Sequence, residues 1–450
     1  MPEEQLLFSV DHMSMSNSFN VNQYDGGEYT MGMAYLAAWQ GPVYDADDPY
    51  GDGVTRDDLA AVKHVQQMLI IDGKDYQGIK EAVFKYGGVQ TSLYSTIASS
   101  KTKTPYYNKQ TNSYCYMGQD KPNHDVVIIG WDDNYPKENF NVDLEGDGAF
   151  ICQNSWGSSF GDNGVFYVSY YDTNVGTHNV VYTDIESADN YDNIYQSDLC
   201  GWVGKMGYDK EDMYGANIFT AQSAESLRAS GFYATAADTS YKLYVVKNFE
   251  NEYSFKNKTL VAEGSLKNAG YYTVDFDEPV DLESGERYAI VLYINTPGST
   301  HPMAIEYNSG EAYMSTVNLD DGEGYISYDG MAYINVKEKQ DCNLCIKAFL
   351  ITDDMYRNIL KIITVFFVML ALIVPVTLEK LPAINEKYDM AKALEDNVLQ
   401  NYVKASTDAK QEKNPDEILQ EKAGFEDDLR IELPDDSEGS ARVYRWKPMP

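Results

Sequence analysis

The sequence predicts an α+β domain followed by an all-β sandwich, one transmembrane helix and a polar tail. Helix-forming segments precede β-rich segments in the first part, short alternating strands fill the second, and a long apolar run follows them. We therefore expect folded domains at residues 1–187 and 190–354. We also expect a transmembrane helix within residues 355–380 and an acidic, largely disordered tail over residues 381–450.

The first domain is expected to begin with helices. Residues 32–39 (GMAYLAAW) and 76–86 (YQGIKEAVFKY) carry apolar side chains at helical spacing, and Gly87 and Gly88 end the second helix. β-Branched and aromatic segments bounded by Gly, Asn and Asp follow, and they predict antiparallel strands. These segments are residues 125–131, 149–156 and 164–171.

The second domain has a different pattern. Short alternating strands are separated by turn signals at close intervals, which is typical of a sandwich or jelly roll and not of βαβ units. Examples are residues 241–246 (YKLYVV), 270–276 (GYYTVDF) and 287–294 (RYAIVLYI).

The apolar run at residues 359–378 is about long enough to cross a bilayer, and its one charge, Lys361, lies near its start. A buried helix of the β domain is the alternative, but a helix that is apolar all round would need protein on every side. Lys380, Lys387 and Lys392 favour a cytoplasmic tail, whereas Arg357 and Lys361 oppose that orientation. The N-terminal segment MPEEQLLFSV has no basic stretch and no long apolar run, so we expect no signal peptide there.

Charge excludes one class of partner. The chain has 70 acidic and 35 basic residues, a formal net charge of −35, so nucleic-acid phosphates would repel its surface. We therefore expect no nucleic-acid partner.

The 38 tyrosines are typical of solvated β-strands, in which the rings pack against neighbours and the hydroxyls remain in contact with water.

Metal and disulfide signals are weak. The five cysteines do not define a disulfide framework, and the C-x-x-C motif at Cys342 and Cys345 has no second ligand pair to complete a zinc site. A pair of strand residues or a local disulfide is the simpler interpretation. Acidic turns at residues 143–148 and 318–324 could offer oxygen ligands to calcium, but neither has EF-hand spacing. The sequence therefore favours solvated turns, with no metal site and no cofactor.

Two short segments carry the chemistry. His124 precedes an apolar strand in PNHDVVIIGWDD, and Asn154 ends the next strand in AFICQNSWGSSFGDNG. A lone histidine in such a place is usually structural or merely exposed. A cysteine peptidase, however, needs a base beside its thiol, and an Asn side-chain oxygen can hold the imidazole of that base in orientation.

The His124 and Asn154 segments together resemble the histidine and asparagine regions of the papain family of cysteine peptidases. The resemblance implies that His124 is the general base and later the acid, and that Asn154 orients its ring. It also implies that Trp156 shields the His–Asn hydrogen bond from water. Three glycines would shape the turn into the next strand, namely Gly157, Gly161 and Gly164.

Upstream segments extend the resemblance. PEEQLLFSV resembles the S-E-Q-x-L segment of the family, and QYDGGEYTMGMAYLAAW resembles its G-C-x-G-G segment without the cysteine. By that match Gly26 and Gly27 would lie along the cleft, where a substrate backbone can approach closely, although the pair could also be a simple turn. Glu28 and Tyr29 are then the nearest candidates for the lining of the second subsite.

One part of the family pattern is missing. The family's nucleophile lies in Q-G-x-C-G-x-C-W, upstream of the S-E-Q segment, and that motif does not occur in this chain. Cys115 lies in a loop before His124. Cys152 lies two residues before Asn154, but no helix N-terminus is placed to lower its pKa, so a core cysteine is the simpler interpretation.

The second domain resembles the lectin-like domain that follows the peptidase domain in some bacterial and archaeal surface peptidases. Together with the features of the first domain, this resemblance leaves three hypotheses for the function. We therefore expect a cysteine-type peptidase held in the cell membrane with its folded domains extracellular, acting on peptides or proteins and inactive as given. This chain would be a truncated form of that peptidase, and DNA upstream of Met1 would encode the thiol. The alternatives are a silent papain-like domain that binds peptides, and a surface adhesion module that binds carbohydrate.

Overall fold

The computed structural model describes residues 6–23, 26–97 and 104–352. The predicted transmembrane helix and polar tail lie outside these residues. No helix within the described ranges is long and apolar enough to cross a membrane.

The first domain contains three helices, α1 (Val10–Met15), α2 (Tyr29–Ala37) and α3 (Tyr76–Tyr86), and side-chain N-caps begin α1 and α3. For α3 the prediction is confirmed at both ends. The Asp75 carboxylate accepts a hydrogen bond from the Gly78 N–H at 2.9 Å, and Gly87 ends the helix in the left-handed conformation. Helix α2 begins at Tyr29, three residues before the predicted start.

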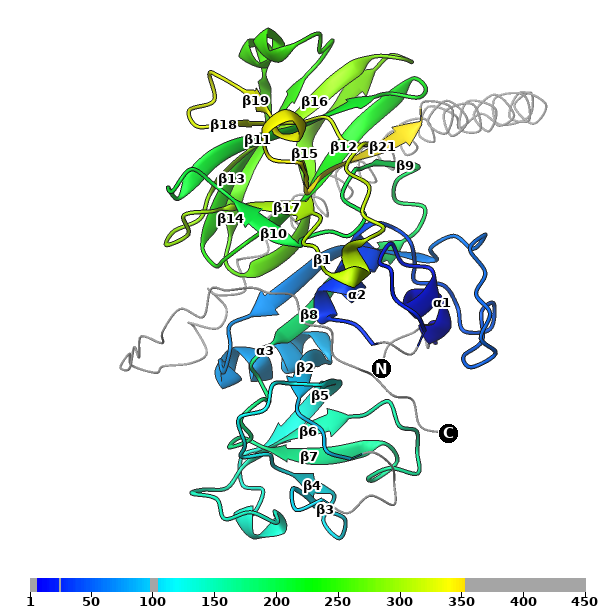
Figure 1. Cartoon of the computed structure of the whole chain (residues 1–450), viewed down its shortest axis with the longest axis vertical. Helices are drawn as coiled ribbons and strands as arrows, with labels where there is room; N and C mark the ends of the chain where they lie inside the picture. The colour runs from blue at the N-terminus through cyan, green and yellow to red at the C-terminus, as the bar shows by residue number, and fades with distance from the viewer. Residues whose placement is uncertain (1–5, 24–25, 98–103, 353–450) are drawn as a thin grey trace, which may run out of the picture. The chain divides into compact units, whose positions relative to one another are not determined.

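The strands of the first domain wrap around one core. Val89, Ile128, Phe150 and Val181 are buried in it, and α3 lies against β5 and β8 (Figure 1). The predicted strands appear as β5, β6 and β7. The bounds are β1 (Lys63–Ile71), β2 (Val89–Leu93), β3 (Tyr107–Asn108), β4 (Ser113–Tyr114), β5 (His124–Asp132), β6 (Ala149–Gln153), β7 (Val165–Ser169) and β8 (Asn179–Ser187).

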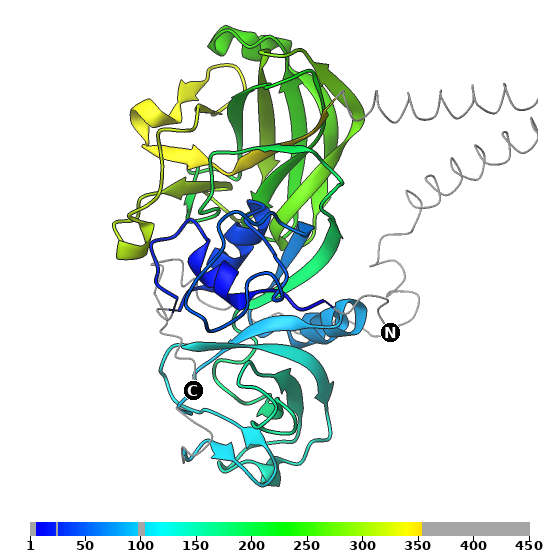
Figure 2. The same ribbon diagram turned by 90° about the vertical axis from the view of Figure 1, so that its right-hand side faces the viewer.

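The second domain is a β-sandwich. Its core lies between β12, β15 and β21 on one side and the outer sheet, ordered β14-β13-β16-β11-β18-β19, on the other (Figures 1 and 2). The bounds are β9 (Asn193–Tyr195), β10 (Gly204–Met206), β11 (Asp212–Thr220), β12 (Glu225–Ala234), β13 (Thr239–Val246), β14 (Thr259–Leu266), β15 (Ala269–Leu282), β16 (Arg287–Asn295), β17 (Met303–Tyr307), β18 (Gly324–Ser327), β19 (Ile334–Asn335), α4 (Val336–Lys339), β20 (Cys342–Leu344) and β21 (Ile346–Thr352).

A backbone ladder joins the two domains. Strand β1 of the first domain pairs antiparallel with β15 of the second, with Leu69 opposite Gly270. The described strands thereby form one continuous large sheet in the order β3-β4-β7-β6-β5-β2-β8-β1-β15-β12-β21-β9. No pattern in the sequence of either strand predicts this pairing. The domains are therefore held by main-chain hydrogen bonds as well as by a linker.

Replacing Gly270 with alanine is expected to destabilise this junction by about 3 kcal/mol. Gly270 has φ +142°, and an added Cβ would overlap the carbonyl oxygen of Met68 on β1. Urea unfolding measures the loss. Gly32→Ala is the matched control, because the nearest atom to its added Cβ is 4.0 Å away and alanine favours a helix. Equal stability of the Gly270→Ala variant and the unsubstituted protein would contradict the close approach.

Candidate functional site

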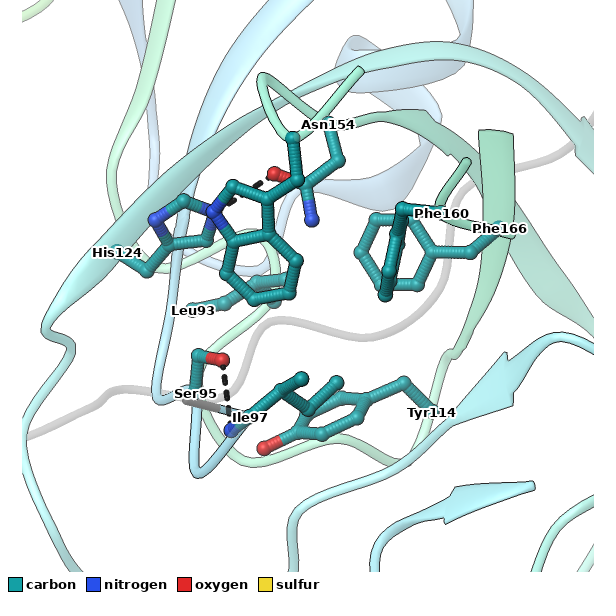
Figure 3. Close-up of a pocket in the computed structure, with 9 residues that line it drawn as sticks. Leu93, Ser95, Ile97, Tyr114, His124, Asn154, Phe160 and Phe166 are labelled. Atoms are coloured by element: carbon teal, nitrogen blue, oxygen red, sulfur yellow. Dashed lines mark hydrogen bonds between the residues drawn. The ribbon is translucent and has the colours of Figure 1, made fainter. Parts of the chain in front are cut away.

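His124 and Asn154 meet at one end of the first domain. The His124 Nε2–H donates a hydrogen bond to Asn154 Oδ1 at 2.9 Å (Figure 3). The Trp156 ring stacks on the imidazole with centroids 4.9 Å apart and an interplanar angle of 26°. The structure thus brings together the three residues that the sequence singled out, with the indole placed to cover the His–Asn hydrogen bond.

A tight turn after β6 holds Asn154. Its N–H donates to the Gly164 carbonyl, and its side-chain oxygen also accepts from the Ser155 N–H at 2.8 Å. Gly164 has φ +89°, and a Cβ there would lie 2.6 Å from the Gln153 amide nitrogen. Only glycine fits this turn without strain, which agrees with the turn-shaping role expected for Gly164.

The ring nitrogens of His124 have different roles. Because the Asn154 oxygen accepts from Nε2, the proton of the neutral ring lies on Nε2 and the lone pair on Nδ1. Nδ1 has no hydrogen-bond partner among the described residues. Burial lowers the pKa of His124, and the hydrogen bond from Nε2 to Asn154 opposes this shift. The ring is therefore neutral at pH 7, with Nδ1 able to accept a proton.

Sequence reasoning missed the apolar wall beside this pair. His124, Asn154 and Trp156 line a small pocket together with side chains from β2, β4 and β7 (Figure 3). The additional lining residues are Leu93, Ser95, Ile97, Tyr114, Phe160 and Phe166. Phe160 contacts the Trp156 ring edge to face, at 4.9 Å and 82°. This wall fixes the indole over the imidazole.

No cysteine of the described residues lines this pocket. All five are in the described ranges, and all are buried free thiols, so Cys342 and Cys345 form no disulfide. Cys152 belongs to the core of the first domain, where burial raises its pKa well above the ordinary value. Burial raises the pKa of Cys115 to about 12. Neither thiol ionises near neutral pH, so neither is suited to nucleophilic attack.

The structure does not bring Gly26 and Gly27 into the His124 pocket. Gly26 has φ +79° at the entry to α2, and neither glycine lines the pocket. Tyr29, the first residue of α2, packs against His178 with ring centroids 5.5 Å apart. The placement of the two glycines along a substrate cleft stays a prediction.

The acidic turn at residues 318–324 is tied to β20. Asn343 Nδ2 donates to the Asn318 carbonyl at 2.9 Å and to Glu306 at 2.8 Å. In the part of the chain that the structure describes, no three His, Cys, Asp or Glu side chains are grouped closely enough to hold a metal ion.

Glu306 is 1% exposed, and burial raises its pKa to about 7. This buried carboxyl is expected to make stability fall as pH rises. Between about pH 4.5 and 7 the folded chain keeps a proton on Glu306 that the unfolded chain has lost, so each rise in pH favours unfolding. Thermal unfolding across this range measures the slope. The Glu306→Gln variant should show a smaller slope, because glutamine does not titrate. Identical pH profiles for the two proteins would refute the assignment.

Comparisons with known proteins cover both domains. Residues 3–185 match the model of the papain family of cysteine proteases, and residues 194–350 match that of the lectin-like domain. A clostridial cysteine protease, Cwp84, solved as a cysteine-to-alanine variant after propeptide cleavage, has a similar fold. The TM-score is 0.69 at 24% identity, over 78% of this chain and 89% of that chain.

A second structure holds the cysteine protease and lectin-like domains of Cwp84, described as a surface layer associated protein of Clostridium difficile. It matches with a TM-score of 0.66 at 23% identity, over 78% of this chain and 79% of that chain. No curated protein matches the chain. At these identities the similarity to solved structures establishes the shared fold.

Proposed function

The chain carries a papain-type cysteine protease domain followed by a lectin-like domain, and we propose that the protein is a cysteine-type peptidase whose second domain binds carbohydrate. The observation that carries the peptidase assignment is the 2.9 Å hydrogen bond from His124 Nε2–H to Asn154, which leaves Nδ1 free as a base. The substrate class is peptides or proteins. The match of residues 194–350 to the lectin-like domain supports carbohydrate binding as the second role.

The proposed mechanism assigns one proton path to His124. Nδ1 takes the proton of a cysteine thiol, and the thiolate attacks the carbonyl carbon of the scissile peptide bond. The imidazolium then gives that proton to the leaving amine as the C–N bond breaks, and water hydrolyses the thioester. The Asn154 oxygen holds the ring and stabilises its charged form. The described thiols are buried elsewhere, so the attacking thiol is not among them.

Protein expressed from the gene together with any coding sequence upstream of Met1, here called the complete gene, tests the peptidase proposal. We expect hydrolysis of a fluorogenic peptide library under reducing conditions, and loss of hydrolysis after treatment with a thiol-directed epoxide. The 450-residue chain alone should take up no epoxide label. A folded protein from the complete gene that cleaves no peptide would overturn the proposal and favour a non-catalytic module that binds peptide or carbohydrate.

We also propose a location at the cell surface, with the apolar run at residues 359–378 as a membrane anchor and the folded domains outside. The length and low charge of this run support the anchor. The surface-layer association described for Cwp84 supports the location. Deleting residues 359–378 should move the protein from the membrane fraction to the soluble fraction, and an unchanged distribution would contradict the anchor.

A further inference from the structure

The face of the outer sheet that points away from the sandwich core is covered over only part of its area. Phe249 and Phe255 pack on it with Ala216, Ile218 and Val291, which closes one part. Beyond them the same face carries tyrosine and charged side chains that are partly exposed. We call this part the tyrosine platform and define it by six residues, Asp212, Tyr214, Lys242, Tyr244, Lys258 and Tyr293.

The tyrosine rings come together through strand register. Tyr214 on β11 is directly opposite Tyr293 on β16, and their ring centroids are 4.9 Å apart. Tyr244 lies on the next strand, β13, opposite Val291. All three rings are partly exposed on one side of the sheet (Figure 1 labels the three strands). Their bodies therefore offer adjoining apolar surfaces at the edge of solvent.

Charged groups surround the rings. The Lys258 ammonium lies 5.8 Å from the Tyr214 centroid and 5.9 Å from the Tyr244 centroid. Lys242 lies opposite Tyr293 and forms an ion pair with Glu263 at 2.7 Å. On the other flank the Tyr293 hydroxyl donates to Asp212 at 3.4 Å. Hydrogen-bond donors and acceptors thus both lie beside the apolar ring faces.

This combination matches the surface of a sugar. A hexose presents C–H groups on its faces, which pack on aromatic rings, and hydroxyls around its edge, which both donate and accept hydrogen bonds. The platform carries two lysines and one aspartate, and the chain as a whole carries a net charge of −35. A polyanionic saccharide would be repelled from such a protein.

We propose that the tyrosine platform binds a polymer of neutral hexoses, with sugar rings lying on Tyr214 and Tyr293 and sugar hydroxyls bonded to Asp212 and Lys242. The inference rests on the proposed carbohydrate-binding role of the second domain and names its site. It does not depend on the peptidase activity.

Calorimetric titration of the full chain with short soluble oligomers of glucose, mannose and galactose tests the site. We expect one of them to bind, and Tyr214→Ala to weaken binding about 10-fold. Asp212→Asn keeps the side-chain shape and should also weaken binding about 10-fold, because a charged acceptor is lost. Tyr293→Phe keeps the ring and should weaken binding less than Tyr293→Ala.

Tyr253→Ala is the matched control, because Tyr253 is 68% exposed and lies outside the platform. It should bind as the unsubstituted chain does. Binding that survives in folded Tyr214→Ala and Asp212→Asn proteins would overturn the platform and leave the carbohydrate role of the domain intact. An anionic polysaccharide is titrated alongside, and binding to it alone would overturn the neutral assignment. Binding to no saccharide would overturn both the platform and that role.

Discussion

Replacing His124 with alanine is expected to lower kcat/KM by about 10⁴-fold or more in protein expressed from the complete gene. The substitution removes the ring that Asn154 orients, and with it the group that takes the thiol proton and returns it to the leaving amine. Stability should change little, since the ring lies at the end of β5 and is only partly buried. Fluorogenic peptide hydrolysis, with urea unfolding alongside, measures both effects.

His301→Ala is the control for this substitution. His301 is exposed in the second domain and its Nδ1 bonds to Thr300, so its loss should leave hydrolysis unchanged. The pH profile gives a second readout, because burial lowers the pKa of His124 and activity should persist below the ordinary histidine pKa of about 6.5. Hydrolysis that survives in a folded His124→Ala protein would remove His124 from the mechanism.

Replacing Lys347 with alanine is expected to cost about 3–5 kcal/mol of stability. Lys347 and Asp198 form an ion pair at 2.8 Å in which the side chains are 1% and 0% exposed. Asp198 Oδ2 has no hydrogen-bond partner in the part of the chain that the structure describes. Burial already raises the pKa of Asp198, and Lys347 opposes this shift. Without Lys347 a buried carboxylate would be left uncompensated.

Denaturant unfolding of three variants separates charge from packing. The pair Lys347→Met with Asp198→Leu should recover much of the loss, because apolar side chains need no partner. Arg56→Ala breaks an exposed pair with Asp58 and should have little effect. A loss in Lys347→Ala no larger than in Arg56→Ala would show that the buried pair contributes little.

Sequence reasoning was most accurate where the determinants are local. Helix α3 has an N-cap in Asp75 and a left-handed stop in Gly87, and both signals lie within one turn of its ends. The prediction placed the start of helix α2 three residues too late. Glu28, which precedes the helix, makes no side-chain cap hydrogen bond, so no local signal in the sequence marks the first helical residue. The all-β character of the second domain followed from alternation within single strands.

The long-range features could not be predicted from one sequence. The site pair was found because His124 begins β5 and Asn154 follows β6 in two short segments that resemble the histidine and asparagine regions of the papain family. The pocket wall combines Leu93 and Tyr114 with Phe166, and these meet only through the strand order of the sheet. Likewise, Tyr214 faces Tyr293 because β16 lies beside β11, an arrangement with no signature in either segment.

The β1–β15 ladder also sets the order in which the protein can be completed during synthesis. Strand β1 ends at Ile71, whereas β15 ends at Leu282, so the ribosome must add 211 residues (282 − 71) between them. At roughly 5–20 residues per second this takes roughly 10–40 s. Throughout that interval the edge of β1 lacks its partner from the second domain. The nascent first domain is thus a transient unfinished sheet, and its exposed edge closes only when the second domain has emerged.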